Sequence, residues 1–91
     1  MKRADGKQKN PKLERAHEFS MNNQSALEKS KLCGCFYCLR IYNPREIEEW
    51  ILDRKETAIC PYCGIDSVLP ESTEYQITEE FLEKMREYWF W

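Results

Sequence analysis

The chain has 91 residues, of which 42% are hydrophobic and 33% charged, the balance of a globular domain rather than of a disordered segment. A chain of this length buries only about 60 to 65% of its unfolded surface, so its core alone is marginal and we expect a covalent or metal cross-link. No apolar run approaches the roughly 18 residues of a membrane span and no apolar segment follows the basic start, which excludes a membrane helix and a secretory signal and predicts a cytoplasmic protein.

Charge is divided unevenly along the chain. Residues 1–15 carry six basic and two acidic side chains, a net charge of +4, whereas residues 16–91 carry a net charge of −6. We expect residues 1–10 to form a flexible basic arm and residues 11–91 to form a single domain. An acidic folded body is poorly suited to the phosphate contacts that dominate nucleic-acid affinity.

Two helices are predicted before the first cysteine. The first begins near Pro11 and is placed at residues 12–19, with Leu13 and Ala16 on its apolar side. A polar break at residues 22–24 then supplies a cap for a second helix at residues 23–31.

The middle of the chain carries a strand signal followed by a helix signal. Residues 39–42 (LRIY) are partly β-branched or aromatic and alternate, which predicts a short strand. Asn43, Pro44 and Glu46 then stand in the order of an N-cap, a first-turn proline and a capping-box acid, which predicts a helix at residues 44–52.

The last third of the chain predicts two strands and a helix. Residues 57–60 and 65–69 are predicted strands of a hairpin-like unit around the second cysteine pair, and Thr78 is the expected cap of a helix at residues 79–90. The chain ends in three consecutive aromatic residues, which helical geometry cannot turn toward one core. We therefore expect part of this helix to be exposed or in an interface, and a homodimer through it is one hypothesis.

Four of the five cysteines form two C-x-x-C pairs, Cys35 with Cys38 and Cys60 with Cys63, with 21 residues between the pairs. This spacing is typical of two knuckles that bring four thiolates to one tetrahedral Zn²⁺. These four residues are the predicted metal ligands, with one structural zinc per chain. The predicted fold class is α+β, a small four-cysteine zinc ribbon of short antiparallel strands packed with three to four helices.

Cys33 leaves an alternative open, because either Cys33 or Cys35 could pair with Cys38 at the metal. We favour Cys35, which leaves Cys33 as a small buried residue or a free thiol near the site. A fifth ligand or an iron–sulfur cluster is the less favoured alternative. His17, the single histidine, is predicted to pack on its helix, since four cysteines already complete a zinc shell.

The letters CPYC at residues 60–63 are also the active-site motif of glutaredoxins. That chemistry requires the first cysteine at the start of a long helix, where the helix dipole lowers the thiol pKa. Residues 64–70 (GIDSVLP) make a poor helix, so redox catalysis is not expected. We predict no enzymatic activity, with thiol chemistry at Cys33 as the exception to be tested.

From Ala16 onward the chain resembles a group of small, uncharacterised bacterial cytoplasmic proteins of zinc-ribbon type. The resemblance is carried by AHEFSMNNQSALEKSKLCGCFYCLRIYNPREIEEWI, TAICPYCGIDSVLPE and ITEEFLEKMREYWF. It implies a bacterial, cytoplasmic protein with a metal-bound ribbon, whose ligand positions match Cys35, Cys38, Cys60 and Cys63. The resemblance implies no activity, substrate or partner, and the additional Cys33 departs from the plain four-cysteine pattern.

Together these features predict a non-catalytic zinc-binding protein that acts as a protein–protein interaction module. The alternative is a nucleic-acid-binding ribbon that uses the basic arm together with the knuckle aromatics Phe36, Tyr37 and Tyr62.

Overall fold

The computed structural model describes residues 9–51 and 56–90, in which two α-helices come first, five short strands follow and a third α-helix comes last. The elements in order are α1 (Pro11–His17), the 3-10 turn η1 (Glu18–Ser20), α2 (Gln24–Glu28), β1 (Cys33–Cys35), β2 (Ile41–Tyr42), the 3-10 turn η2 (Pro44–Glu46), β3 (Glu49–Ile51), β4 (Thr57–Ile59), β5 (Val68–Leu69) and α3 (Glu79–Phe90). The predicted α+β class with short antiparallel strands is confirmed. Most of the predicted basic arm, residues 1–8, lies outside the described residues.

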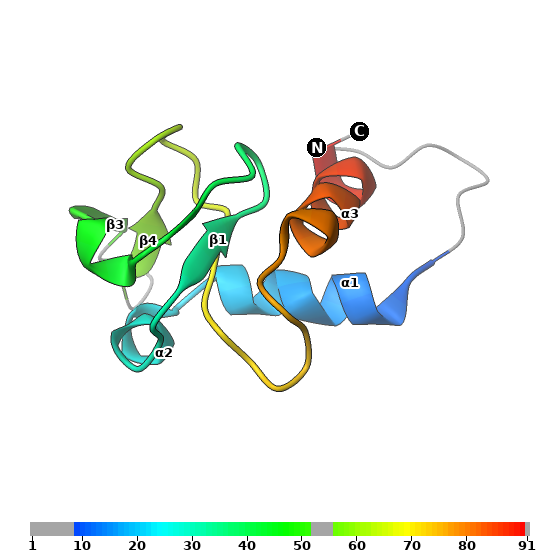
Figure 1. Cartoon of the computed structure of the whole chain (residues 1–91), viewed down its shortest axis with the longest axis horizontal. Coiled ribbons are helices and arrows are strands. Elements are labelled where there is room, and N and C mark those ends of the chain that lie inside the picture. The colour runs from blue at the N-terminus through cyan, green and yellow to red at the C-terminus, as the bar shows by residue number, and fades with distance from the viewer. Residues whose placement is uncertain (1–8, 52–55, 91) are drawn as a thin grey trace.

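The strands form two small antiparallel sheets (Figure 1). One sheet has the order β2-β1-β5, with Cys33 opposite Tyr42 and Cys35 opposite Val68. The other pairs β3 with β4. The predicted hairpin of residues 57–60 with 65–69 is therefore wrong: the strands before and after the second cysteine pair belong to different sheets, because β4 pairs with β3 and β5 pairs with β1.

The predicted helix at residues 44–52 is also wrong. Asn43 does cap the turn that follows it, since its side-chain oxygen accepts from the N–H of Arg45 at 2.9 Å, but that turn is the single 3-10 turn η2. Ile47 is already extended, and β3 begins at Glu49. The cap signal acts only on the first turn, whereas pairing of Trp50 with Ala58 of β4 supplies the hydrogen bonds of a strand.

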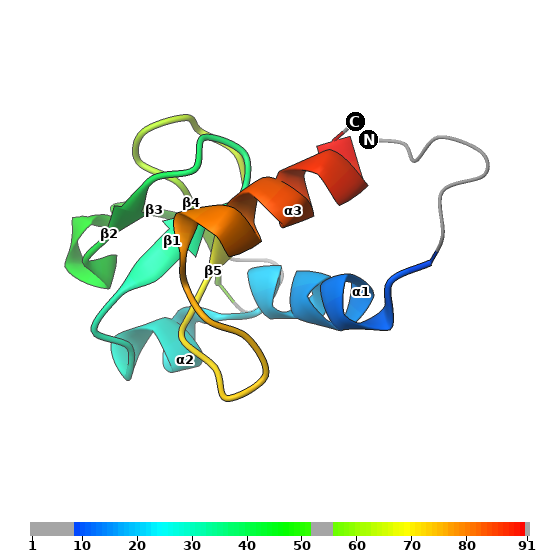
Figure 2. The same ribbon diagram turned by 45° about the vertical axis from the view of Figure 1, so that its right-hand side comes forward.

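Helices α1 and α3 pack against each other beside the three-stranded sheet (Figures 1 and 2). α3 begins as predicted, with the Thr78 hydroxyl accepting from the N–H of Phe81 at 3.1 Å. The apolar side of α3 is buried in a core formed by Leu13, Ala16, Phe36, Leu69, Tyr75, Phe81, Leu82, Met85 and Tyr88. Trp89 and Phe90 pack against the same core, so the apolar side of α3 is largely covered within the chain. None of the helices in the described part of the chain has the length and apolar character needed to cross a membrane.

A second core surrounds the cysteines. It consists of Leu27, Cys33, Cys35, Tyr42, Ile47, Ala58, Cys60 and Val68. Buried Asn23 connects the two sheets beside this core: its side-chain nitrogen donates to the carbonyl of Val68 at 2.9 Å, and its side-chain oxygen accepts from the N–H of Ala58 at 3.1 Å. Asn23 makes no side-chain cap bond to α2.

Candidate metal centre

The structure brings the four predicted ligands together. The Sγ atoms of Cys35, Cys38, Cys60 and Cys63 all lie within 4.8 Å of one another. Cys35 and Cys60 are buried, whereas Cys38 and Cys63 are partly exposed. Figures 1 and 2 show the two turns that carry them, in green and yellow-green, side by side at one edge of the molecule.

The first knuckle, residues 35–38, is closed by backbone hydrogen bonds around its first cysteine. The carbonyl of Cys35 accepts from the N–H of Leu39 at 2.8 Å, and the N–H of Cys35 donates to the carbonyl of Arg40 at 3.0 Å. The N–H of Tyr37 lies 3.4 Å from the Cys35 Sγ. These bonds reverse the chain and direct a backbone dipole at the sulfur.

The second knuckle, residues 60–63, repeats every one of these contacts. The carbonyl of Cys60 accepts from the N–H of Gly64 at 2.9 Å, and the N–H of Cys60 donates to the carbonyl of Ile65 at 3.0 Å. The N–H of Tyr62 lies 3.4 Å from the Cys60 Sγ. Two equivalent turns therefore face each other, each presenting two sulfurs.

The distances between the sulfurs fit one tetrahedral ion. Zn–S bonds of about 2.3 Å in a tetrahedron place the sulfurs about 3.8 Å apart. The Sγ atoms of Cys35 and Cys63 are 3.6 Å apart, and those of Cys38 and Cys60 are 3.7 Å apart. None of these four cysteines forms a disulfide, so all four sulfurs are available as metal ligands. Four sulfur donors suit a soft, thiolate-binding ion such as Zn²⁺.

Burial and hydrogen bonding act in opposite directions on the buried sulfurs. Burial raises the pKa of Cys35, although the Ser67 hydroxyl, 3.0 Å from its Sγ, favours the thiolate. At Cys60 burial also acts to raise the pKa, but the nearby Tyr42 hydroxyl, which forms no hydrogen bond of normal geometry, and the backbone N–H groups of Tyr62 and Cys63 outweigh burial and lower the pKa. The site thus carries donors that favour sulfur in its charged form.

Cys33 lies outside this four-sulfur group. It is fully buried, and its thiol donates to the backbone carbonyl of Tyr42 at 3.5 Å. Burial raises the pKa of Cys33 to about 12, so the side chain is a neutral thiol at ordinary pH. Of the two arrangements that the sequence left open, the geometry places Cys35 beside Cys38.

His17 is also outside the group and packs as predicted. Its ring centroid is 4.2 Å from that of Trp89 and 5.9 Å from that of Phe36. The imidazole therefore joins α1 to α3 and to the first knuckle. It offers no nitrogen to the cysteine group.

The tyrosines of the two knuckles are exposed but already have neighbours. Tyr37 meets Phe90 edge-on at 5.0 Å and lies beneath the Arg86 guanidinium. The Tyr62 ring lies beneath the Arg40 guanidinium, with 4.6 Å between guanidinium carbon and ring centroid. Its hydroxyl donates to the Glu46 carboxylate.

Sequence reasoning missed three residues that shape the site. The Ser67 hydroxyl lies 3.0 Å from the Cys35 Sγ, the Tyr42 ring packs in the core around the cysteines, and Leu39 adopts the positive φ expected of a glycine. Tyr42 and Ser67 come near the cysteines through the pairing of β1 with its two neighbouring strands. Tyr42 lies opposite Cys33, and Val68, the residue after Ser67, lies opposite Cys35. These positions become apparent only once the register of the sheet is known.

The chain was compared with protein-family models, with curated proteins and with solved structures, and none of the three comparisons found a match. The resemblance to small bacterial zinc-ribbon proteins therefore stays a prediction.

Proposed function

We propose that this protein is a non-catalytic zinc protein in which Cys35, Cys38, Cys60 and Cys63 hold one structural Zn²⁺. The observation that carries the proposal is the mutual approach of four sulfurs at the spacing of a tetrahedral thiolate site. Four cysteine ligands leave no open position for a substrate or a water molecule, which supports a structural rather than a catalytic metal. The neutral, buried Cys33 thiol is a poor nucleophile, which argues against thiol catalysis there.

The site joins two parts of the chain that belong to different sheets. One knuckle follows β1 and the other follows β4, which belong to different sheets. Structural zinc contributes about 10 to 16 kcal/mol in zinc-finger peptides, as much as the whole stability of a typical small domain of about 5 to 15 kcal/mol. The bound ion would therefore supply a large share of the folding free energy.

Metal content and cobalt substitution test the zinc site. We expect one equivalent of zinc in protein purified without chelator, and a tetrahedral, thiolate-rich absorption spectrum when Co²⁺ replaces zinc. Cys60→Ser should lose the metal, whereas Cys33→Ser, the matched control for a buried cysteine outside the group, should keep it. Absence of stoichiometric metal from the wild type, or loss of metal from Cys33→Ser alone, would contradict the assignment.

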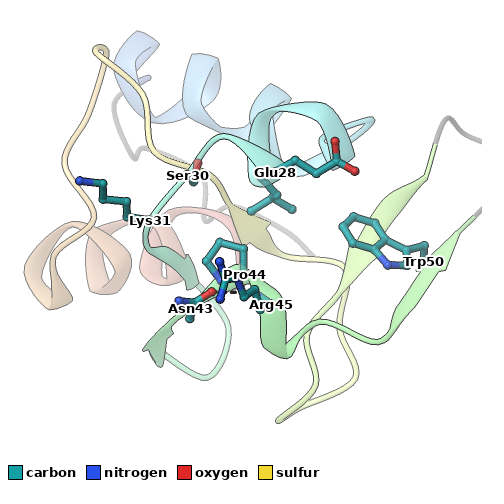
Figure 3. Close-up of a pocket in the computed structure, with 8 residues that line it drawn as sticks. Glu28, Ser30, Lys31, Asn43, Pro44, Arg45 and Trp50 are labelled. Carbon is teal, nitrogen blue, oxygen red and sulfur yellow. Dashed lines mark hydrogen bonds between the residues drawn. The ribbon is translucent and has the colours of Figure 1, made fainter.

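We further propose that the metal-bound body presents a groove to a protein partner. A hollow of about 600 Å³ lies between α2, η2 and β3. Figure 3 shows Trp50 at one end of the hollow and Lys31 at the other, with Asn43, Pro44 and Arg45 between them. Within the described residues neither Lys31 nor Arg45 forms an ion pair. Glu28 also lines the hollow, so the groove holds two cations and one carboxylate. A partner segment that places an apolar side chain against Trp50 and Leu27 and a carboxylate at Lys31 and Arg45 would fit it.

The surface favours a protein partner over nucleic acid. Stacking on bases requires free aromatic faces, whereas Tyr37 and Tyr62 each already lie beneath an arginine of the same chain. The net charge of −6 on residues 16–91 also opposes phosphate binding. A homodimer through α3 has less support, since the apolar side of that helix is covered within the chain.

The groove is tested by reversing its charges. Three zinc-loaded baits are compared in the source organism's extract, and the captured proteins are quantified by mass spectrometry. The baits are the wild type, a groove variant with Lys31→Glu and Arg45→Glu, and a control variant with Lys84→Glu and Arg86→Glu. The control changes the charge by the same amount on α3. A protein captured by the wild type and the control but lost from the groove variant supports the proposal. Equal capture by all three baits, or no specific capture at all, refutes it.

A further inference from the structure

Tyr42, at the end of β2, carries a buried hydroxyl that forms no hydrogen bond of normal geometry. The residue is 6% exposed, and among the described residues its hydroxyl is the one buried side-chain oxygen or nitrogen that lacks a partner. Buried polar groups in folded proteins are nearly always paired. An orphan of this kind therefore indicates an acceptor that becomes available in another state of the site.

The acceptor is indicated by the position of the ring. Tyr42 packs in the core that contains Cys60, and its ring centroid lies 5.2 Å from that of Tyr62, whose N–H points at the Cys60 sulfur. A protonated thiol is a weak hydrogen-bond acceptor. A metal-bound cysteine is a thiolate, and hydrogen bonds to ionised acceptors are markedly stronger than neutral ones. The hydroxyl would gain a strong partner when the site holds its ion.

The equivalent cysteine of the other knuckle already has such a donor. The Ser67 hydroxyl lies 3.0 Å from the Cys35 Sγ. Each knuckle also directs a tyrosine N–H at the sulfur of its first cysteine at 3.4 Å. With Tyr42 included, both buried sulfurs have the same kind of surroundings: one backbone N–H from the knuckle and one hydroxyl from outside it.

We propose that the Tyr42 hydroxyl donates a hydrogen bond to the metal-bound thiolate of Cys60 and is a positioning residue of the zinc centre, the counterpart of Ser67 at Cys35. This inference rests on the proposed zinc site. Four thiolates around a divalent cation carry a net charge of −2, and hydroxyl donors spread that charge. Hydrogen-bonded groups of this kind around metal ligands typically change affinity by about 10- to 100-fold.

The same geometry explains the fifth cysteine. Cys33 lies opposite Tyr42 in the β1–β2 ladder, and its thiol donates to the Tyr42 carbonyl. This contact fixes the backbone from which the tyrosine ring reaches the sulfur. Cys33 thus acts on the site through Tyr42 rather than as a ligand.

The test compares Tyr42→Phe with Tyr75→Phe in the full chain. Both remove a hydroxyl from a buried tyrosine, but that of Tyr75 donates to the Pro70 carbonyl at 2.6 Å in the other core. Zinc affinity is measured by competition with a chromophoric chelator, and thiolate-to-cobalt charge transfer is measured in the Co²⁺-loaded proteins. Circular dichroism confirms that each loaded variant is folded.

We expect Tyr42→Phe to bind zinc about 10-fold more weakly and to move the charge-transfer band to longer wavelength, because loss of the donor raises the energy of the sulfur electrons. Ser67→Ala should move the band in the same direction, and Tyr75→Phe should change neither property. A wild type that binds metal while Tyr42→Phe has the same affinity and spectrum overturns this inference alone. A wild type that binds no metal overturns the zinc site itself.

Discussion

Leu39 occupies in the first knuckle the place that Gly64 occupies in the second. Each follows the first cysteine of its knuckle by four positions, and each donates its N–H to the carbonyl of that cysteine, at 2.8 Å and 2.9 Å. Their φ angles are 68° and 78°. Leucine is disfavoured in this left-handed region, so the first knuckle is held in a costly conformation that the packing of Leu39 against the α1–α3 core offsets.

Replacing Gly64 with alanine should destabilise the second knuckle through the backbone alone. A Cβ at this position meets no atom within 4 Å, so the cost comes from the positive φ and is about 1 to 2 kcal/mol. Thermal unfolding of the zinc-loaded protein measures it. Gly64→Asn is the matched control and should lose less, because asparagine tolerates this conformation. Equal losses in the two variants would show that backbone strain is not the cause.

Replacing Gly34 with alanine should destabilise the protein for a different reason. The added Cβ would lie 2.9 Å from Cδ1 of Leu82 and 3.2 Å from Cγ2 of Ile77, where the start of α3 crosses β1. Overpacking of this kind costs about 1 to 3 kcal/mol. In a Leu82→Ala background the closest contacts disappear and only the one with Ile77 remains, so a double-mutant cycle should give a large coupling energy. Additive effects on the free energy of unfolding would contradict the contact.

Metal removal should unfold most of the protein. If the ion contributes about 10 to 16 kcal/mol, the apo chain keeps little net stability. We expect excess chelator to abolish the helical circular dichroism signal and cooperative melting, and added zinc to restore both. If demonstrably metal-free protein still melts cooperatively, the two hydrophobic cores are enough to fold the chain without zinc.

Local signals in the sequence predicted the parts of the structure that local interactions determine. The two C-x-x-C pairs met as expected, and Thr78 caps α3. Strand β1 was missed because its three residues, Cys33–Cys35, carry no pattern, and only pairing with β2 and β5 makes them a strand. The helix expected after Pro44 failed for the same reason, since pairing of Trp50 with Ala58 in β4, and not the local pattern of residues, makes this segment a strand.

Asn23 shows how a correct local signal can conceal a long-range role. An asparagine before α2 indicates an N-cap, but its side chain instead bonds Val68 and Ala58, which lie in different sheets. If capping were its role, Asn23→Asp would be tolerated, because aspartate caps as well as asparagine does. We expect instead a loss of about 2 to 3 kcal/mol, because the donor to the buried carbonyl is gone.

The control for Asn23 is Asn43, whose side chain does cap the turn that follows it. Asn43→Asp should leave the free energy of unfolding nearly unchanged. Denaturant unfolding of the zinc-loaded variants compares the two substitutions directly. If Asn23→Asp is tolerated as well as Asn43→Asp, the proposed bridge between the sheets contributes little.

His17 should make stability depend on pH. Burial lowers its pKa below the ordinary value of 6.5, against the attraction of the Asp66 and Glu18 carboxylates, which acts to raise it. Between the lowered pKa and 6.5 the unfolded chain binds more protons than the folded chain, so stability rises with pH across that window. The contribution of the neutral imidazole is fully present above pH 6.5 and is lost as the pH falls.

The measurement compares wild type with His17→Gln at several pH values between 7.5 and 6.0, both saturated with zinc. Subtracting the two free energies of unfolding removes the pH dependence of the metal site, which the variants share. We expect the advantage of the wild type to shrink steadily below pH 6.5, because the proton must enter a site flanked by the rings of Trp89 and Phe36. A difference that stays constant over this range would mean that the imidazole titrates equally in the folded and unfolded chain, and its position between the two rings would then have no electrostatic consequence.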